Sequence, residues 1–409
     1  MKTAILSVGT EILFGQITNT NTVYLSRELN NMGLDVMYHY TVGDNPERVA
    51  EIMELALKDV DMILTTGGLG PTQDDLTKEV ACRVFSDELV VNEHALGLIE
   101  SYFKRTGRKM TENNTKQALM PSRAIVFQND AGTAPGFALE RDGKYIVCMP
   151  GPPREMTRMF QVSVKPFLEK MTDSVMRYRI LRFYGIGESE LETRLLPVID
   201  GQTDPTIATY AKEGECQVRI ASKRADGDEA DAAVEEMTSK VLDIAGEYCF
   251  SLENEDLVQV VAEKLMTKGL TIASAESCTG GLFAAALTDI PGISGSFKAG
   301  FVTYSNESKV RELGVNPEAL EKYGAVSEET AREMVEGLYE RTGCDVCVSV
   351  TGIAGPGGGT PEKPVGLVYI GFKYGDRCFV TKKLSSGASR KWTRNHTLLG
   401  MLDIVRRNI

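Results

Sequence analysis

Histidine and long apolar runs are scarce in this chain of 409 residues. The three histidines are His39, His94 and His396, and no apolar run approaches the roughly 20 residues that a membrane-spanning helix needs. The first residues, MKTAILSVGTEIL, lack the apolar region and the small-residue cleavage site of a signal peptide, and they have the pattern of a buried strand that enters a glycine turn. We therefore expect a globular, cytoplasmic protein with no membrane partner.

Clusters of lysine and arginine are also absent, and the net charge is −12. Nonspecific binding to a duplex depends on basic side chains that neutralise phosphates, so the composition argues against a nucleic-acid partner. A small phosphorylated ligand remains compatible with this charge, because one or two well-placed arginines are enough to bind it.

The eight cysteines do not form a metal-binding pattern. Cys344 and Cys347 make one CxxC pair, but no second pair accompanies it and histidines are few. A structural zinc site needs four ligands, so the sequence predicts no zinc site. We expect the scattered cysteines to be small buried side chains rather than disulfides.

A chain of this length is too long for a single core, so two or three domains are expected. Residues 1–170 alternate short apolar runs with helical patterns, which predicts a parallel sheet covered by helices on both faces. Ligands of such sheets bind at the carboxyl ends of the strands. The expected strands are AILSV, VMYHYTV, MILTTGG and YIVCMPG, and the expected loops at their carboxyl ends include TVGDNP and TTGGLGPTQDD.

Residues 171–251 have the pattern of a small α+β domain: a strand, a turn with the sequence GIGE, a helix, a hairpin and a long helix. The GIGE turn is similar to the short glycine loop of KH-type modules, although the acidity of this segment favours a dimerising or spacing role over RNA binding. Residues 252–409 again alternate strands and helices. The expected fold class is therefore α/β, with two three-layer α/β domains joined by a small α+β KH-like domain.

The segment AESCTGG joins an expected buried strand to a helix and contains Ser277. A serine close to a helix N-terminus has free N–H groups and the helix dipole nearby, and both stabilise negative charge that develops during catalysis. The alternative is that Ser277 or Thr279 serves only as the N-cap of the helix. The segment does not match the GxSxG pattern of α/β-hydrolases.

Three further features lie downstream of this segment. Tyr304 and Lys309 follow an expected strand, where catalytic groups of α/β proteins tend to lie. A glycine- and proline-rich loop, residues 351–359, would let backbone amides approach a ligand, but it is not a Walker A loop. Arg390 and Arg394 are four residues apart in a helical segment, so they share one face and could clamp a phosphate, or else remain solvated surface charges.

These segments resemble the CinA C-terminal family, whose members include nicotinamide mononucleotide deamidases. The similarity covers residues 252–409 and rests on AESCTGG, GFVTYSNESK, YGAVSEET, VTGIAGPGGG and EKPVG. The resemblance implies hydrolysis of the nicotinamide carboxamide to nicotinic acid mononucleotide and ammonia, without a cofactor. It also implies a Ser–Lys site, carried here by Ser277 and Lys309 with Tyr304 nearby.

The residues are consistent with that chemistry. A serine hydroxyl is a poor nucleophile until a base removes its proton, and a neutral lysine can do so if burial or a nearby cation lowers its pKa. Cys278 is the rival nucleophile, although no histidine partner is evident for it. Amides of residues 278–281 or of Thr351 and Gly352 are expected to stabilise the oxyanion. The expected catalytic residues are Ser277, Lys309, Tyr304 and Thr279, and the expected substrate-binding residues are Gly280, Gly281, Thr351, Gly352, Gly355, Gly357, Arg390 and Arg394.

Residues 1–168 resemble the molybdopterin-binding domain of molybdenum cofactor biosynthesis proteins, in the form that is fused in full-length CinA proteins. The similarity rests on GTEILFGQITNTNTVYL, TTGGLGPTQDDLTKEVA, NDAGTAPGF and CMPGPPREM. Gly67, Gly68 and Gly70 would let the loop after one strand approach a phosphate or a pterin.

Three aspartates, Asp44, Asp74 and Asp75, lie in the two loops expected at one edge of this sheet. Carboxylates of this kind suit a divalent metal such as Mg²⁺, Mn²⁺ or Co²⁺. The alternative is that Asp44 and Asp74 cap the helices that follow them.

Relatives of this N-terminal domain include ADP-ribose pyrophosphatases, which fits metal-assisted attack on a pyrophosphate, and others bind molybdopterin. Together with the deamidase, the pyrophosphatase interpretation predicts an enzyme of pyridine-nucleotide salvage that acts on nicotinamide mononucleotide and ADP-ribose. A dimerising role of the middle domain would make this enzyme a homodimer. The alternatives are a non-catalytic protein associated with competence or DNA damage, and a molybdopterin-binding N-terminal half.

Overall fold

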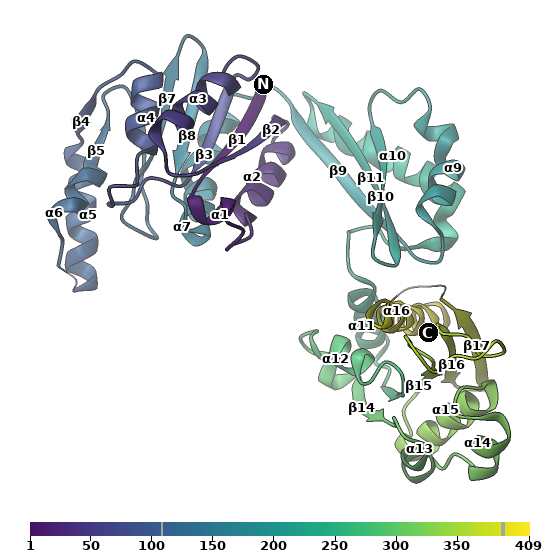
Figure 1. Ribbon diagram of the computed structural model, residues 1–409. Coiled ribbons are helices and arrows are strands. Elements are labelled where there is room, and N and C mark those ends of the chain that lie inside the picture. Colours follow the sequence, from purple (N-terminus) through teal and green to yellow (C-terminus); the bar gives the residue numbers. More distant parts are fainter. Residues whose placement is uncertain (108, 386–388) are drawn as a thin grey trace. The chain divides into compact units, whose positions relative to one another are not determined.

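The computed structural model describes residues 1–107, 109–385 and 389–409 (Figure 1). The chain divides into two compact units, residues 1–178 with 221–234 and residues 179–220 with 235–409. Within the described residues, no helix combines the length and the apolar character needed to cross a bilayer.

A six-stranded sheet forms the centre of the N-terminal domain. Its strand order is β2 (Asp35–Val42), β1 (Lys2–Val8), β3 (Met62–Thr66), β8 (Lys144–Met149), β7 (Gly136–Arg141) and β6 (Ile125–Phe127). The first four strands are parallel, and β7 and β6 are antiparallel to their neighbours. The predicted parallel sheet is confirmed, and the two antiparallel strands extend it at one edge.

Helices cover both faces of this sheet. Successive side chains of a strand point to opposite faces, and apolar side chains of the strands point to both. Ile5 and Leu64 pack in one core with α2 (Thr20–Asn31), α7 (Pro153–Met159) and α8 (Lys165–Glu169). Leu6 and Ile63 pack in a second core with α3 (Pro46–Ala56) and α4 (Thr77–Val84). The other elements are α1 (Thr10–Leu13), β4 (Leu89–Val91), α5 (Glu93–Thr106), α6 (Glu112–Thr115), η1 (Lys116–Ala118), β5 (Leu119–Pro121) and η2 (Phe160–Val164).

The middle domain is a small α+β unit, as predicted. Its sheet has the order β10 (Thr206–Lys212), β11 (Glu215–Arg224), β9 (Val175–Phe183) and β12 (Cys249–Ser251), and its helices are α9 (Glu188–Ile199), α10 (Gly227–Ala245) and η3 (Gly246–Tyr248). The GIGE turn joins β9 to α9, and the φ angle of +89° at Gly185 is one that glycine adopts without strain.

The C-terminal domain has a five-stranded sheet. Its order is β14 (Phe297–Val302), β13 (Ile272–Glu276), β15 (Val346–Gly352), β16 (Leu367–Tyr374) and β17 (Arg377–Leu384). The first three strands are parallel, and β16 and β17 are antiparallel to their neighbours.

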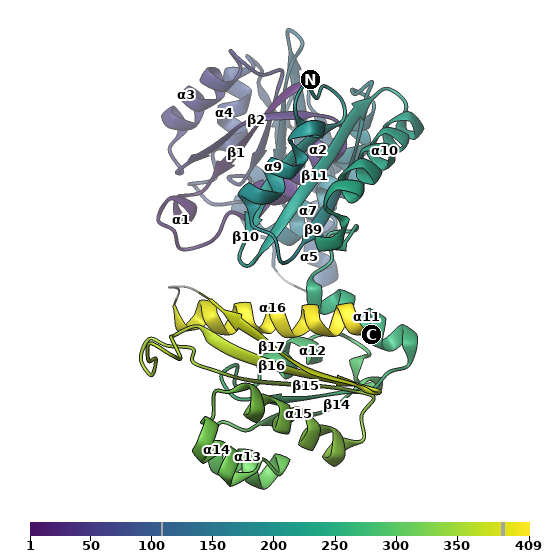
Figure 2. The same ribbon diagram turned by 90° about the vertical axis from the view of Figure 1, so that its right-hand side faces the viewer.

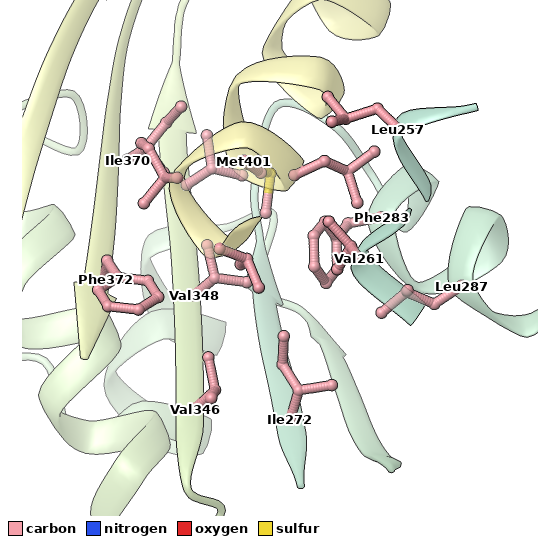
Figure 3. Close-up of a cluster of buried hydrophobic side chains, with 14 of the residues drawn as sticks. Leu257, Val261, Ile272, Phe283, Leu287, Val346, Val348, Ile370, Phe372 and Met401 are labelled. Carbon is pink, nitrogen blue, oxygen red and sulfur yellow. The ribbon is translucent and has the colours of Figure 1, made fainter. Parts of the chain in front are cut away.

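Two helical layers enclose this sheet (Figure 2). One consists of α11 (Leu257–Lys268), α12 (Leu282–Thr288) and α16 (Arg390–Asn408), and the other of α13 (Asn306–Leu313), α14 (Pro317–Tyr323) and α15 (Glu328–Thr342); the short η4 (Ile293–Gly295) follows α12. Val346 and Val348 of β15 pack with the first layer (Figure 3), whereas Cys347 between them packs with the second. The alternation gives the three-layer α/β arrangement that the sequence predicts.

The strand order brings three loops together. Strands β14, β13 and β15 are adjacent and parallel, so their carboxyl ends lie at one edge of the sheet. Tyr304, Ser277 and Gly352 follow or end these three strands. Residues far apart in the sequence are therefore available to a single site.

Candidate functional site

Ser277 directly follows β13 and is held by its backbone. Its N–H donates to the carbonyl of Val350 at 3.0 Å, and its own carbonyl accepts from the Gly280 N–H at 3.1 Å. The side chain is almost buried, and its Oγ lies 3.3 Å from Nζ of Lys309. The structure thus brings together the two residues of the expected Ser–Lys pair.

Lys309, on α13, is only 1% exposed. Its Nζ donates to the carbonyls of Thr303 at 2.9 Å and Tyr304 at 3.4 Å, in addition to Ser277 Oγ. Among the described residues, no carboxylate lies within ion-pair distance of this ammonium group. Burial lowers the pKa of Lys309, because desolvation disfavours the charged form.

Helix α12 is capped by Glu276 rather than by the residues considered from the sequence. The Glu276 carboxylate accepts from the N–H groups of Gly281 (3.0 Å), Phe283 (3.1 Å) and Ala284 (3.0 Å). Gly281 is the N-cap residue, and neither Ser277 nor Thr279 caps the helix. The expectation of free helix N–H groups beside Ser277 is therefore corrected, because Glu276 occupies them. Gly280 and Gly281, two expected oxyanion donors, already donate within the turn.

The two residues after Ser277 are buried within the turn. Burial raises the pKa of the Cys278 thiol to about 12, so its thiolate is disfavoured at neutral pH. Thr279 is fully buried, and its hydroxyl has no hydrogen-bond partner among the described residues. This environment favours Ser277 over Cys278 as the nucleophile.

A cavity of about 190 Å³ opens at the Ser277–Lys309 pair. Six predicted residues line it: Ser277, Tyr304, Lys309, Thr351, Gly352 and Arg390. The other lining residues are Cys278, Ala325, Val326 and Ala354. The hydroxyl of Thr351 donates to the carbonyl of Ala325 at 2.6 Å and so links two of the lining residues. The predicted residues that do not line this cavity are Thr279, Gly280, Gly281, Gly355, Gly357 and Arg394.

The two arginines of α16 have different contacts. Arg390 donates to the carbonyl of Gly355 at 2.9 Å and to the hydroxyl of Tyr304 at 3.0 Å, and it lines the cavity. Arg394 donates to the carbonyl of Thr279 at 2.6 Å, behind the serine turn. Only Arg390 of the expected pair faces the space in which a ligand would lie.

The histidine of this domain is directed elsewhere. His396 stacks on Trp392, with ring centroids 4.6 Å apart, and it lines a different cavity together with Tyr184. A serine–histidine arrangement is therefore not formed at Ser277.

The N-terminal domain contains a separate cavity of about 560 Å³. All six predicted residues of this domain line it: Gly67, Gly68, Gly70, Asp44, Asp74 and Asp75. Two acidic residues that the sequence patterns did not single out, Glu11 and Glu155, also line it. A Cβ at Gly67 would lie 2.1 Å from the carbonyl oxygen of Val8, which explains why glycine is required in this loop.

The aspartates of this cavity do not cap the following helices. Asn45 caps α3, and α4 begins after Leu76 without a side-chain cap. Asp44 Oδ2 instead accepts from the N–H of Thr10 at 3.0 Å and from its hydroxyl at 2.7 Å. The capping alternative for Asp44 and Asp74 is wrong.

Asp75 is oriented in the same way, since its Oδ2 accepts from both the N–H and the hydroxyl of Thr72. Gly70 faces this carboxylate, and a Cβ there would lie 2.5 Å from it. No group of three or more His, Cys, Asp or Glu side chains in the described ranges is close enough to hold a metal ion by itself.

Three family models match successive parts of the chain. Residues 4–170 match "Probable molybdopterin binding domain", residues 178–251 match "Damage-inducible protein CinA KH domain", and residues 254–409 match "CinA C-terminal domain".

Full-length relatives and a solved structure are also similar. A "Putative competence-damage inducible protein" of Clostridium botulinum (strain Kyoto / Type A2) is 46% identical over 409 residues, which cover 100% of both chains. A "CinA-like protein" of Dictyoglomus thermophilum is 46% identical over 410 residues, 100% of this chain and 99% of that one. The crystal structure of competence/damage inducible protein CihA from Agrobacterium tumefaciens is 41% identical and covers 37% of this chain and 94% of its own, with a TM-score of 0.36. The chain belongs to the CinA family and combines its C-terminal domain with a KH domain and a molybdopterin-binding-like domain.

Proposed function

We propose that the C-terminal domain is an amidohydrolase that deamidates nicotinamide mononucleotide, with Ser277 as nucleophile and Lys309 as general base. The observation that carries the proposal is the position of Lys309 Nζ, buried, without a carboxylate partner and 3.3 Å from Ser277 Oγ. An adjacent acid would keep the lysine charged, whereas burial favours the neutral form that can accept a proton.

The reaction follows from these two groups. Neutral Lys309 accepts the Ser277 hydroxyl proton as the oxygen bonds to the carboxamide carbon, and the carbonyl electrons move onto oxygen. When the tetrahedral intermediate collapses, the C–N bond breaks and the Lys309 ammonium returns its proton to nitrogen, so that ammonia leaves. Water then attacks the acyl carbon of the Ser277 ester and gives its proton to Lys309. The bond between Ser277 Oγ and that carbon breaks, Lys309 returns the proton to Oγ, and nicotinic acid mononucleotide is released.

The direct test is incubation of the purified full chain with nicotinamide mononucleotide, with ammonia and nicotinic acid mononucleotide measured together. The proposal expects both products in equal amounts. Binding of the mononucleotide without either product would favour the non-catalytic alternative.

Arg390→Ala is expected to lower kcat/KM for nicotinamide mononucleotide by about ten- to a hundred-fold. Arg390 is the arginine of α16 that lines the cavity, and a charge-assisted contact to the 5′-phosphate contributes about 1.5–3 kcal/mol. Steady-state kinetics with nicotinamide riboside, which lacks the phosphate, should differ little between the variant and the parent enzyme.

The matched control is Lys391→Ala, because Lys391 is the neighbouring cation on α16 and is exposed outside the cavity. It should leave both substrates unaffected. An equal loss on both substrates in Arg390→Ala would instead assign Arg390 to the support of Tyr304 and Gly355, which it also contacts.

We propose in addition that the N-terminal cavity hydrolyses the pyrophosphate of ADP-ribose with a divalent cation. Asp44 and Asp75 are each held through Oδ2 by a threonine, which orients both carboxylates in one cavity. Mg²⁺ commonly binds through one or two carboxylates together with waters and substrate phosphates, so a cage of three protein ligands is not needed. Such a cation would polarise the phosphoryl oxygens, while the loop at Gly67 and Gly68 would lie against the phosphates.

Removal of metal should separate the two activities. In EDTA, hydrolysis of ADP-ribose is expected to stop, whereas deamidation should continue because acyl transfer between serine and lysine needs no ion. Asp75→Asn should likewise reduce the hydrolysis of ADP-ribose and leave deamidation unchanged. Asp142→Asn is the matched control, because its carboxylate is exposed in a turn outside the cavity. Deamidation that EDTA abolishes and added metal restores would contradict the Ser–Lys mechanism.

A further inference from the structure

A third cavity, of about 450 Å³, lies where the GIGE turn meets residues of the C-terminal domain. One wall consists of Tyr184, the turn itself and Glu188 at the start of α9. Lys383 of β17 and His396 of α16 also line the cavity. Cavities of this size commonly accommodate small organic ligands.

Lys383 is a partly buried cation without an acidic partner. Its Nζ donates to the hydroxyl of Tyr184 at 3.0 Å and lies 4.9 Å from the centre of that ring. No carboxylate of the described chain is within ion-pair distance of it. Its stem packs over Gly400, where a Cβ would lie 3.1 Å from Nζ. An anion in the cavity would complete the contacts of this ammonium group.

His396 also presents an unused polar atom. Its Nδ1 is buried and has no hydrogen-bond partner in the described residues, although the residue lines the cavity. A buried polar atom of this kind is normally satisfied, so its isolation points to a ligand or a water that supplies the contact.

The remaining charged residues of the cavity show where an uncharged polar group would bind. Lys212 pairs with Asp256, and Glu215 pairs with Arg182. Glu188 has no basic partner within ion-pair distance among the described residues, and it lines the same cavity as Lys383. A carboxylate placed in this way accepts hydrogen bonds from sugar hydroxyls, as acidic residues do in dinucleotide sites.

We propose that this cavity is a second ligand site, which binds a phosphorylated ribonucleoside with the phosphate against Lys383 and His396 and the ribose hydroxyls against Glu188. The ring of the base would lie along the apolar surface of Ile186 and Ala211, which also line the cavity. The site is independent of the deamidase chemistry, since none of its residues lines the cavity at Ser277.

The same geometry argues against a continuous RNA strand at the GIGE turn. In KH modules a glycine loop holds several successive nucleotides of the backbone. Here Lys383 of β17 and His396 of α16 line the same cavity as the turn, and its volume of about 450 Å³ suits one nucleotide rather than several.

The test is a titration of the full chain with AMP, followed by tryptophan fluorescence. Trp392 is the one tryptophan of the chain and stacks on His396, so it reports on the wall of this cavity. We expect a saturable signal in the parent protein and a Kd that is about ten- to a hundred-fold weaker in Lys383→Gln. Lys382→Gln is the matched control, because Lys382 is the exposed neighbour on the same strand.

Two further variants locate the ligand. Glu188→Gln should weaken the binding of AMP and leave the binding of inorganic phosphate unchanged. This variant also tests the site if Lys383→Gln does not fold. The Lys383-dependent part of the AMP signal should persist in Arg390→Ala, which removes only phosphate binding at the Ser277 cavity. Three results would each overturn the proposal. The first is an AMP titration that does not saturate, and the second is loss of AMP binding in Arg390→Ala but not in Lys383→Gln. The third is Lys383-dependent binding of a single-stranded RNA without binding of AMP.

Discussion

Ser277→Ala is expected to lower kcat/KM for nicotinamide mononucleotide by roughly 10⁴-fold or more, because losing a covalent nucleophile removes the acyl-enzyme route altogether. The remaining rate would come from substrate binding alone. Ammonia release by the full chain, measured at saturating and at low substrate concentrations, provides the comparison.

Cys278→Ala is the control for this variant, since Cys278 is adjacent and lines the same cavity. Its thiol is buried with a pKa of about 12, so its removal should leave most of the activity. If Cys278→Ala were inactive while Ser277→Ala retained turnover, the nucleophile would be the cysteine and the proposed mechanism would be wrong.

Lys309→Met is expected to lower kcat by about 10²- to 10⁴-fold, which is the usual contribution of a general base. Methionine fills a similar volume without a titratable group. Lys309→Arg should be no better, because a guanidinium does not lose its proton in the accessible pH range. Recovery of activity in Lys309→Arg would indicate that the positive charge, and not the base, is what the reaction needs.

The pH profile gives an independent check on Lys309. The reactive form is the neutral amine, so kcat/KM should fall as the pH drops through the pKa of this group. Burial lowers that pKa from the ordinary lysine value of about 10.4, so the midpoint should lie below it. A profile that falls as pH rises would exclude a lysine base.

Much of the fold can be predicted from apolar periodicity. The four parallel strands of the first sheet are short apolar runs separated by amphipathic helices, and the structure has them where the pattern indicates. The antiparallel strand β7 is not predicted, although Asp142 and Gly143 form the hairpin turn that joins it to β8. Their φ angles of +54° and +75° are those of a two-residue hairpin loop, and an Asp-Gly pair is a known signal for it. That signal was present in the sequence.

The site is only partly predictable, because it depends on strand order. Lys309 lies 32 positions after Ser277, and its contact with the serine arises because β14 is the direct neighbour of β13. Periodicity identifies strands but does not say which of them are neighbours. Likewise, nothing in the sequence indicates that the carboxylate of Glu276 turns back to cap α12.

Arg390 and Arg394 illustrate a second limit of predicting the site from the sequence. Residues four apart on a helix share a face, but they are also separated by about 6 Å along its axis. That displacement is enough for Arg390 to reach Gly355 and Tyr304 while Arg394 reaches Thr279. A shared face therefore does not imply a shared ligand.

Helix α16 combines two kinds of local stability. Its later turns contribute Met401, Leu402 and Val405 to the core, whereas Arg390 and Lys391 in its first turn are exposed. Amide hydrogens of the later turns should exchange only when the whole domain unfolds, and those of the first turn should exchange through fraying of a single turn. The end of the helix that carries Arg390 can therefore adjust its contacts while the rest of the helix stays fixed in the core.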